Sequence, residues 1–102
     1  MMLIKKPYSI EEIRKIAAPI AKAHGVKRIA LFGSYAKGEA NEESDVDFLV
    51  DKGTMIGLIR YFTFVYDLED ALKCHVDVVT TTGSDQNFIN KIRANEVLLY
   101  EE

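Results

Sequence analysis

A glycine–serine turn and a pair of aspartates frame two apolar runs, and together they constrain the fold of this chain more than any other feature. The first run, residues 27–32, ends at Gly33-Ser34, and the second, residues 45–51, opens with Asp45 and Asp47. If the second run is a strand, alternate side chains point to opposite faces, so the two aspartates share one face about 7 Å apart. The apolar side chains between and after them then point to the other face, toward a core.

The aspartate pair is a candidate site for divalent metal, because two carboxylates on one face repel each other unless a cation lies between them. Magnesium prefers carboxylate oxygens and completes its coordination with water and substrate phosphates. Two such ions, about 3.5–4 Å apart, can stabilise the attacking and leaving oxygens of an in-line phosphoryl displacement. We therefore predict that Asp45 and Asp47 bind magnesium.

The turn at Gly33-Ser34 is a candidate site for the phosphates of a nucleotide. Glycine lets the main chain approach a phosphate closely, the Ser34 hydroxyl can donate a hydrogen bond, and a short helix starting here would offer free N–H groups. Lys37 adds a positive charge nearby, and Ser44 either caps the loop turn before the aspartates or reaches a phosphate. The residue order of a Walker A loop is absent.

A third aspartate, Asp77, lies in a β-branched run at residues 75–80, which is typical of a strand. If this strand pairs beside the one that carries Asp45 and Asp47, Asp77 completes a three-carboxylate site, binds one metal and activates an incoming hydroxyl. His75 alternates onto the same face as Asp77 and could approach the site, although the pattern favours an ordinary surface histidine without such a role.

These residues resemble the signature of the DNA polymerase beta-type nucleotidyltransferase superfamily, and in particular its smallest branch, the minimal nucleotidyltransferases. That signature is Gly-Ser, a short spacer, Asp-x-Asp and a later lone Asp on a strand. The resemblance extends over nearly the whole chain, because the order of the elements and the length agree as well. The positions that fit the branch are Gly33, Ser34, Gly38, Ser44, Asp45, Asp47 and Asp77.

The resemblance implies a palm-like core in which Asp45, Asp47 and Asp77 are catalytic and hold two Mg²⁺ ions, with ATP as the nucleotide substrate. In this branch the enzyme is often the antitoxin of a helical HEPN-class toxin, and it can transfer AMP from ATP to a tyrosine of that partner. Many members carry arginine at the position of Lys37, and lysine keeps the charge but lacks the planar fork. The implied nucleotide-binding residues are Gly33, Ser34, Lys37 and Ser44.

Three other interpretations of the motif stay open. The chain could be a binding module, an antitoxin that occludes its partner without catalysis, although the complete set of acids favours an active enzyme. It could transfer a nucleotide to a small molecule such as an antibiotic, although relatives of that kind usually carry an extra domain for the acceptor. The aspartates could also cap turns at a sheet edge, which accounts for Asp45 but does not require Asp47 and Asp77.

Length, charge and cysteine content limit the function classes. The 102 residues predict a single domain, 1–102, with a modest core, and leave no room for the template-holding domains of a polymerase. The formal net charge of −3 argues against broad nucleic-acid binding, because proteins of that class usually present a basic face. The single cysteine, Cys74, excludes an intrachain disulfide and fits a reducing cytoplasm. The longest apolar region, residues 55–66, is interrupted by Arg60 and is too short to span a membrane.

The pattern of elements predicts an α/β fold, with a small mixed or mostly antiparallel sheet and helices mainly on one face. A capping box at Ser9 opens a first helix, which Pro19 should bend or locally break and Gly25 should end. An exposed sheet edge could also support a homo-oligomer. Further helices are expected at 57–73 and 85–95, strands at 27–32, 45–51 and 75–80, and a short strand or extended tail at 97–100.

The helix at 57–73 is rich in aromatic residues on more than one side. This composition predicts either a thick core face or a surface for a protein partner, because aromatic residues are enriched at interfaces. Its expected core stripe is Leu58, Phe62, Val65, Leu68 and Leu72. The residues expected to face inward from the helix at 85–95 are Phe88, Ile89 and Ile92.

Overall fold

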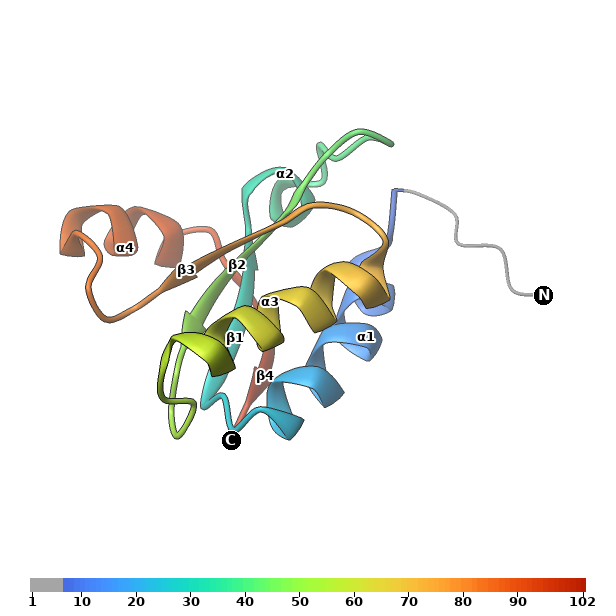
Figure 1. Ribbon diagram of the computed structural model, residues 1–102. Coiled ribbons are helices and arrows are strands. Elements are labelled where there is room, and N and C mark those ends of the chain that lie inside the picture. Colours follow the sequence, from blue (N-terminus) through green and yellow to red (C-terminus); the bar gives the residue numbers. More distant parts are fainter. Residues whose placement is uncertain (1–6) are drawn as a thin grey trace.

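A computed structural model describes residues 7–102, in which helices and strands alternate along the chain (Figure 1). Each predicted strand and long helix is present within two residues of its expected ends, and a short helix follows the Gly33 turn. Among these residues, no helix is both long and apolar enough to cross a membrane. The elements are α1 Ile10–Ala23, β1 Arg28–Phe32, α2 Gly33–Lys37, β2 Val46–Asp51, α3 Leu58–Leu72, β3 Val76–Thr80, α4 Gln86–Arg93 and β4 Val97–Glu101.

The strands form one mixed sheet in the order β3-β2-β1-β4. Strand β1 is antiparallel to both β2 and β4, whereas β2 is parallel to β3. A parallel pair needs a crossover connection, and α3 supplies it between β2 and β3. The predicted α/β fold with a mixed sheet is therefore confirmed.

The alternation of side chains along β2 separates a thickly covered face of the sheet from a thinly covered one. Val46, Phe48 and Val50 are buried in the main core together with residues of α1 and α3. Leu49 points to the opposite face and is buried with two isoleucines of α4. Figure 1 shows α1 and α3 side by side and α4 set apart from them. Helices thus cover mainly one face, as predicted, and Asp47 lies on the other.

Helix α1 begins at the predicted capping box. The Glu12 N–H donates to Ser9 Oγ at 3.1 Å, and the Ser9 N–H donates to Glu12 Oε1 at 2.8 Å. The helix ends at Ala23, followed by His24 as its C-cap and Gly25 with φ of +76°. Glycine adopts this left-handed conformation without strain, so the predicted helix end is confirmed as well.

Pro19 does not break α1: of the two predicted effects, a bend or a local break, the break is wrong, because the helix is continuous from Ile10 to Ala23. Proline removes one main-chain donor and crowds the carbonyl four residues earlier. The alanines on either side, Ala17 and Ala21, are fully buried. Their packing holds the helix on the core and offsets the lost hydrogen bond.

The buried stripe of α3 differs from the predicted one. Phe64, Leu68 and Leu72 are buried, whereas Leu58 and Phe62 are 69% and 59% exposed. The prediction is therefore correct for the C-terminal half of the helix and wrong for the N-terminal half. Several rows of side chains on this helix are apolar, and the row through Phe64 is the one that meets the main core.

Helix α4 buries Ile89 and Ile92, as predicted, but Phe88 is 45% exposed and the prediction for it is wrong. The helix has only eight residues and packs on a small cluster around Leu49. So short a helix covers the sheet with one row of side chains, and Phe88 lies outside that row.

The exposure of α3 side chains can be tested with two leucines of the same helix. Leu68→Ala removes a fully buried side chain, so it should lower the free energy of unfolding by about 2–5 kcal/mol. Leu58→Ala removes an exposed one and should change it by less than about 0.5 kcal/mol. Urea denaturation followed by circular dichroism measures both values, and equal losses would contradict the observed stripe.

Candidate active site

The predicted carboxylates lie at one end of the sheet, where β1 ends and β2 and β3 begin. Because β1 is antiparallel to β2, its last residue, Phe32, pairs with Asp47. Because β3 is parallel to β2, Asp77 pairs with Asp47 from the other side. The predicted adjacency of the two acidic strands is confirmed, and Asp47 lies between the turn at Gly33 and Asp77.

The environment of Asp47 disfavours a negative charge. Its pKa is raised to about 6, first by partial burial and then by the hydrogen bond and the charge of Asp77. The charge of Asp45 acts in the same direction, and His75 acts against it. This is the crowding of like charges that the sequence predicted for the site, and a bound cation would relieve it.

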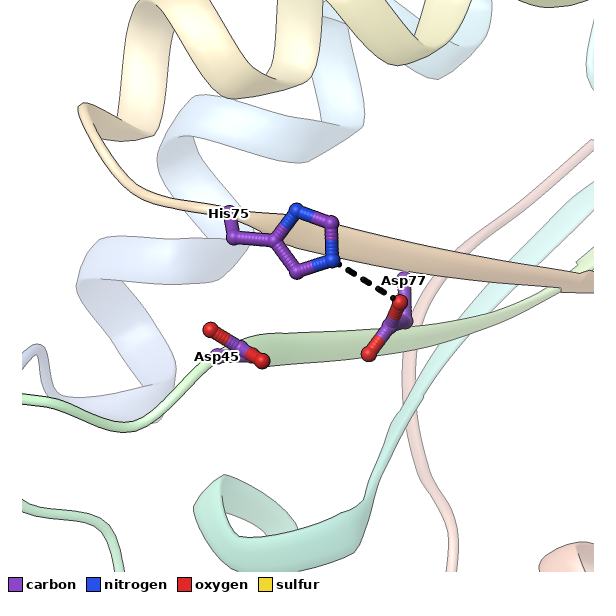
Figure 2. A group of neighbouring side chains, drawn as sticks. All are labelled: Asp45, His75 and Asp77. Atoms are coloured by element: carbon purple, nitrogen blue, oxygen red, sulfur yellow. Dashed lines mark hydrogen bonds and ion pairs between the residues drawn. The ribbon is translucent and has the colours of Figure 1, made fainter.

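The side chains at this end of the sheet suit a divalent metal. Asp45, His75 and Asp77 each offer one ligand atom, and these atoms lie within 4.8 Å of one another (Figure 2). Ligand atoms around one magnesium or calcium ion are separated by roughly 3–4 Å, so small side-chain rotations would bring the two carboxylates of this group into range. Asp47 adds a carboxylate against Asp77. A donor set dominated by carboxylate oxygens fits a hard cation such as Mg²⁺.

Gly33 fits against Asp47 in a place where a larger residue would not. Its φ is +73°, and a Cβ atom at this position would lie 2.2 Å from Asp47 Oδ2. Both the left-handed backbone and the close approach require glycine. The glycine that the sequence assigned to phosphate contact therefore also leaves room for the central carboxylate.

The other predicted nucleotide-binding residues lie in the segments that follow this turn along the chain. Ser34 follows Gly33 in α2, and Lys37 is exposed and lines a hollow of about 300 Å³ together with Gly33 and residues of α4. Ser44 lies in the loop before β2, where its Oγ accepts a hydrogen bond from the Asn41 N–H at 2.8 Å. This bond is the local capping role that the sequence left open for Ser44.

Two further residues contact the site. His75 Nε2 lies 3.1 Å from Asp77 Oδ1, and His75 Nδ1 lies 3.2 Å from Glu69 Oε2. The pKa of His75 is raised, chiefly by the charge of Asp77. The position of His75 agrees with its two-residue spacing from Asp77, and its side chain is also 60% exposed, as expected of a surface histidine. Glu69 comes from α3, and no spacing in the sequence relates it to the acids.

The chain is similar over most of its length to nucleotide-transferring proteins. The sequence model of the family described as "Polymerase beta, Nucleotidyltransferase" matches residues 12–102. A Methanocaldococcus jannaschii protein, provisionally named protein adenylyltransferase MJ0435, is 44% identical over 72 residues, covering 71% of this chain and 77% of that protein. Protein adenylyltransferase MntA of Thermococcus cleftensis is 39% identical over 75 residues, covering 70% and 76% of the two proteins.

The fold is also similar to that of a chain in a solved complex of tri-AMPylated HEPN toxin from Shewanella oneidensis with MNT antitoxin. The TM-score is 0.71, with 18% sequence identity, over 91% of this chain and 73% of that chain. At this identity the similarity concerns the arrangement of helices and strands.

The raised pKa of Asp47 predicts a stability cost at neutral pH. A carboxyl with a folded pKa of about 6, against an ordinary value of 3.8, stabilises the fold when it is protonated, and this contribution is lost as the pH rises through 6. Asn resembles the protonated form. In EDTA at pH 7.5, Asp47→Asn should therefore raise the free energy of unfolding by about 1 kcal/mol. This is less than the full pKa difference implies, because Asp47 is only partly buried and solvent screens its charge. At pH 4 the gain should nearly vanish.

Urea denaturation of both proteins at the two pH values measures this difference. Asp51→Asn is the matched control, because Asp51 lies at the other end of β2 from Asp47, beside Arg28 of β1. A loss of stability in Asp47→Asn at pH 7.5, or an equal gain in both variants, would contradict the assigned environment of Asp47.

Proposed function

Because the chain belongs to the minimal branch of the polymerase beta-type nucleotidyltransferase family, we propose that it is a Mg²⁺-dependent protein adenylyltransferase. It transfers AMP from ATP to a hydroxyl group, and the acceptor is a tyrosine of a HEPN-type toxin whose antitoxin it is. The observation that carries this proposal is the meeting of Asp45, Asp47 and Asp77 beside Gly33 at one end of the sheet.

The metal-binding residues in this proposal are Asp45, Asp47 and Asp77. The support for this set is their crowding, which makes ionisation of Asp47 unfavourable without a cation nearby. When bound, a pair of Mg²⁺ ions supplies positive charge to the phosphoryl oxygens and lowers the pKa of the acceptor hydroxyl. Asp47 is the most enclosed of the three and acts as the fixed centre of the set, whereas Asp45 and Asp77 are exposed.

The transfer makes one bond and breaks one. The acceptor oxygen bonds to the α-phosphorus of ATP, the bond from that phosphorus to the bridging oxygen breaks, and pyrophosphate leaves. Asp77 receives the proton of the acceptor hydroxyl. Its position supports this role, because it lies on β3, at the edge of the sheet, with a side chain that is 54% exposed. An acceptor can therefore approach Asp77 from solvent.

The triphosphate extends from the carboxylates over the turn at Gly33. The main chain of Gly33 and the hydroxyl of Ser34 hold the β- and γ-phosphates, since a residue without a side chain permits close approach. Lys37 contributes charge from the hollow beside Gly33. Ser44, in the loop before Asp45, completes the proposed nucleotide-binding set.

An exposed apolar surface supports a protein partner. It occupies the N-terminal half of α3 and the residues before it, and its side chains are between 59% and 84% exposed. Contiguous apolar patches on small domains mark interaction sites, and aromatic residues are enriched there. The solved complex of an MNT antitoxin with a HEPN toxin supports a HEPN-type occupant. This surface, the α3 patch, consists of Ile56, Leu58, Ile59, Phe62 and Tyr66.

The α3 patch also favours a second candidate function, in which the chain neutralises a toxin by occlusion alone. Binding through this patch does not involve the carboxylates. Occlusion, however, gives no reason for three acids to meet beside a glycine that fits against one of them. We therefore rank transfer above occlusion.

Transfer can be measured directly by intact mass. Incubation with Mg²⁺, ATP and the product of the neighbouring gene should add one or more AMP units to that partner. Asp47→Asn removes a proposed metal ligand while keeping the shape of the side chain, so the rate should fall by a factor on the order of 10² or more. Asp51→Asn, on the same strand, should retain the activity. A stable complex without any mass gain would favour occlusion over transfer.

The partner surface can be tested by placing a charge on it. Leu58→Glu changes a residue of the α3 patch that is 69% exposed, so the fold should be retained and the complex weakened at least tenfold. Leu98→Glu is the matched control, because Leu98 lies on β4 and is 40% exposed. Titration calorimetry gives both affinities. Equal affinities for the two variants would place the partner on another surface.

A further inference from the structure

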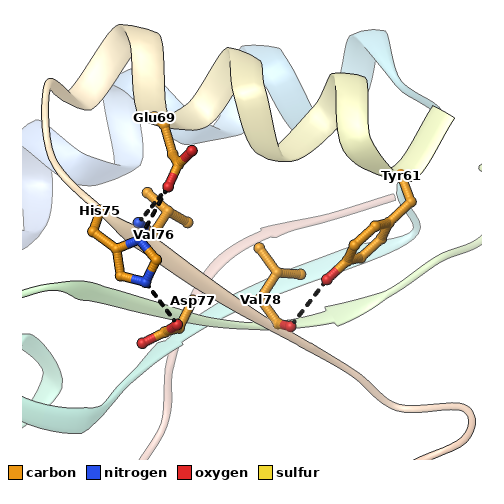
Figure 3. A network of polar contacts seen from close by, with 6 residues as sticks. All are labelled: Tyr61, Glu69, His75, Val76, Asp77 and Val78. Carbon is orange, nitrogen blue, oxygen red and sulfur yellow. Dashed lines mark hydrogen bonds and ion pairs between the residues drawn. The ribbon is translucent and has the colours of Figure 1, made fainter. Parts of the chain in front are cut away.

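A series of polar contacts connects Glu69 on α3 with the carboxylate of Asp77 (Figure 3). Glu69 Oε2 lies 3.2 Å from His75 Nδ1 and accepts a hydrogen bond from the Val76 N–H at 3.1 Å. The other ring nitrogen, Nε2, lies 3.1 Å from Asp77 Oδ1. Figure 3 shows the imidazole of His75 between the two carboxylates, so both of its nitrogens have acidic partners.

The local backbone explains why these residues meet. Helix α3 ends at Leu72, and Lys73 adopts a left-handed conformation with φ of 57°. The chain therefore reverses within a few residues and enters β3 at Val76. Glu69 lies one turn before the helix end, so its side chain reaches the first residues of the strand.

We propose that His75, held by Glu69, is a positioning residue that fixes the Asp77 carboxylate, so that Asp77 presents its second oxygen to the metal site. The inference rests on the proposed function, because it concerns the same three acids. Asp77 contacts His75 on one side and Asp47 on the other. These two contacts restrict the rotamers of the Asp77 carboxylate, whereas an unrestrained carboxylate would lose more rotamer entropy when it binds metal.

The exposure of these side chains argues for a role in the site and against a role in stability. The side chains of His75 and Asp77 are 60% and 54% exposed, and ion pairs at such positions contribute little to folding. Hydrogen bonds to metal-ligating side chains, in contrast, orient the ligands, and their loss typically reduces metal affinity or activity by about 10–100-fold. The effect of His75 should therefore be visible in metal binding and nearly absent from the free energy of unfolding.

Two possible roles of His75, as a positive charge and as a positioning residue, predict opposite changes in cation affinity when His75 is removed. If His75 acted only as a positive charge beside the acids, its removal would strengthen the binding of a cation, because one repulsive charge would be gone. If it positions Asp77, its removal weakens the binding. The sign of the change therefore separates the two roles.

The test measures Mn²⁺ affinity by electron paramagnetic resonance in the protein without nucleotide or partner, with Mn²⁺ as the probe for the Mg²⁺ site. His75→Ala should lower the affinity about tenfold. His75→Gln has the same charge change but keeps an amide donor near the place of Nε2, so it should retain most of the affinity. An unchanged or increased affinity in His75→Ala would overturn the proposal, and so would a direct ¹⁴N coupling from His75 to the bound Mn²⁺.

The role of Glu69 is tested with two neighbouring acids of α3. Glu69→Gln can still accept the hydrogen bond from Val76 but loses the charge beside His75, so Mn²⁺ affinity should fall several-fold. Asp70→Asn is the matched control, because Asp70 is exposed and pairs with Lys73. In the double variant with His75→Ala, Glu69→Gln should add no further loss, since Glu69 acts through His75. Equal effects of the Glu69 and Asp70 variants would overturn the part assigned to Glu69.

Failure of this inference is distinguishable from failure of the proposed function. Mn²⁺ binding requires neither ATP nor an acceptor, so a protein that binds Mn²⁺ through a positioned Asp77 but transfers no AMP would contradict only the function. An active enzyme whose Mn²⁺ affinity does not depend on His75 would contradict only the positioning role. A protein that binds no Mn²⁺ without nucleotide would contradict the positioning role, and the mass measurement with ATP and the partner would still decide the function separately.

Discussion

The parallel pairing of β2 with β3 is the constraint on which the site depends. This register places Asp77 directly beside Asp47, and the antiparallel pairing of β1 brings Gly33 to the other side of the same carboxylate. A shift of one residue in the β2–β3 register would move Asp77 to the opposite face of the sheet. The crossover helix α3 secures the register, because its buried row packs in the same core as Val46 and Phe48.

The cost of this arrangement is visible in the electrostatics. Partial burial raises the pKa of Asp47 to about 6, and the hydrogen bond and charge of Asp77 act in the same direction, so at neutral pH the fold would be more stable without the charge of Asp47. The thinly covered face makes the cost tolerable, since solvent screens the exposed members of the group. The same exposure leaves the carboxylates of Asp45 and Asp77 accessible from solvent. One face of the sheet therefore forms the core, and the other carries a polar site in which negative charges are crowded.

Most of this site could be predicted from the sequence, because the patterns that indicate it involve residues close together in the chain. Strand alternation put Asp45 and Asp47 on one face, and the glycine turn marked the end of β1. The pairing of β3 beside β2 needed the structure, because spacing does not determine strand order. Glu69 was not predictable for the same reason: it reaches the site through the end of α3. The predicted stripe of α3 was wrong at Leu58 because several rows of that helix are apolar, and periodicity does not show which row meets the core.

The positions of the α3 patch and of the carboxylates limit how a partner could be both bound and modified. The patch lies on the N-terminal half of α3, while the carboxylates lie near the C-terminal end of that helix and on the opposite face of the sheet. Under the proposed function, the surface that binds a partner and the acids that modify it are therefore different parts of one domain. Substitutions in the patch should then weaken complex formation, and substitutions of the acids should reduce transfer, so the two properties can be changed separately.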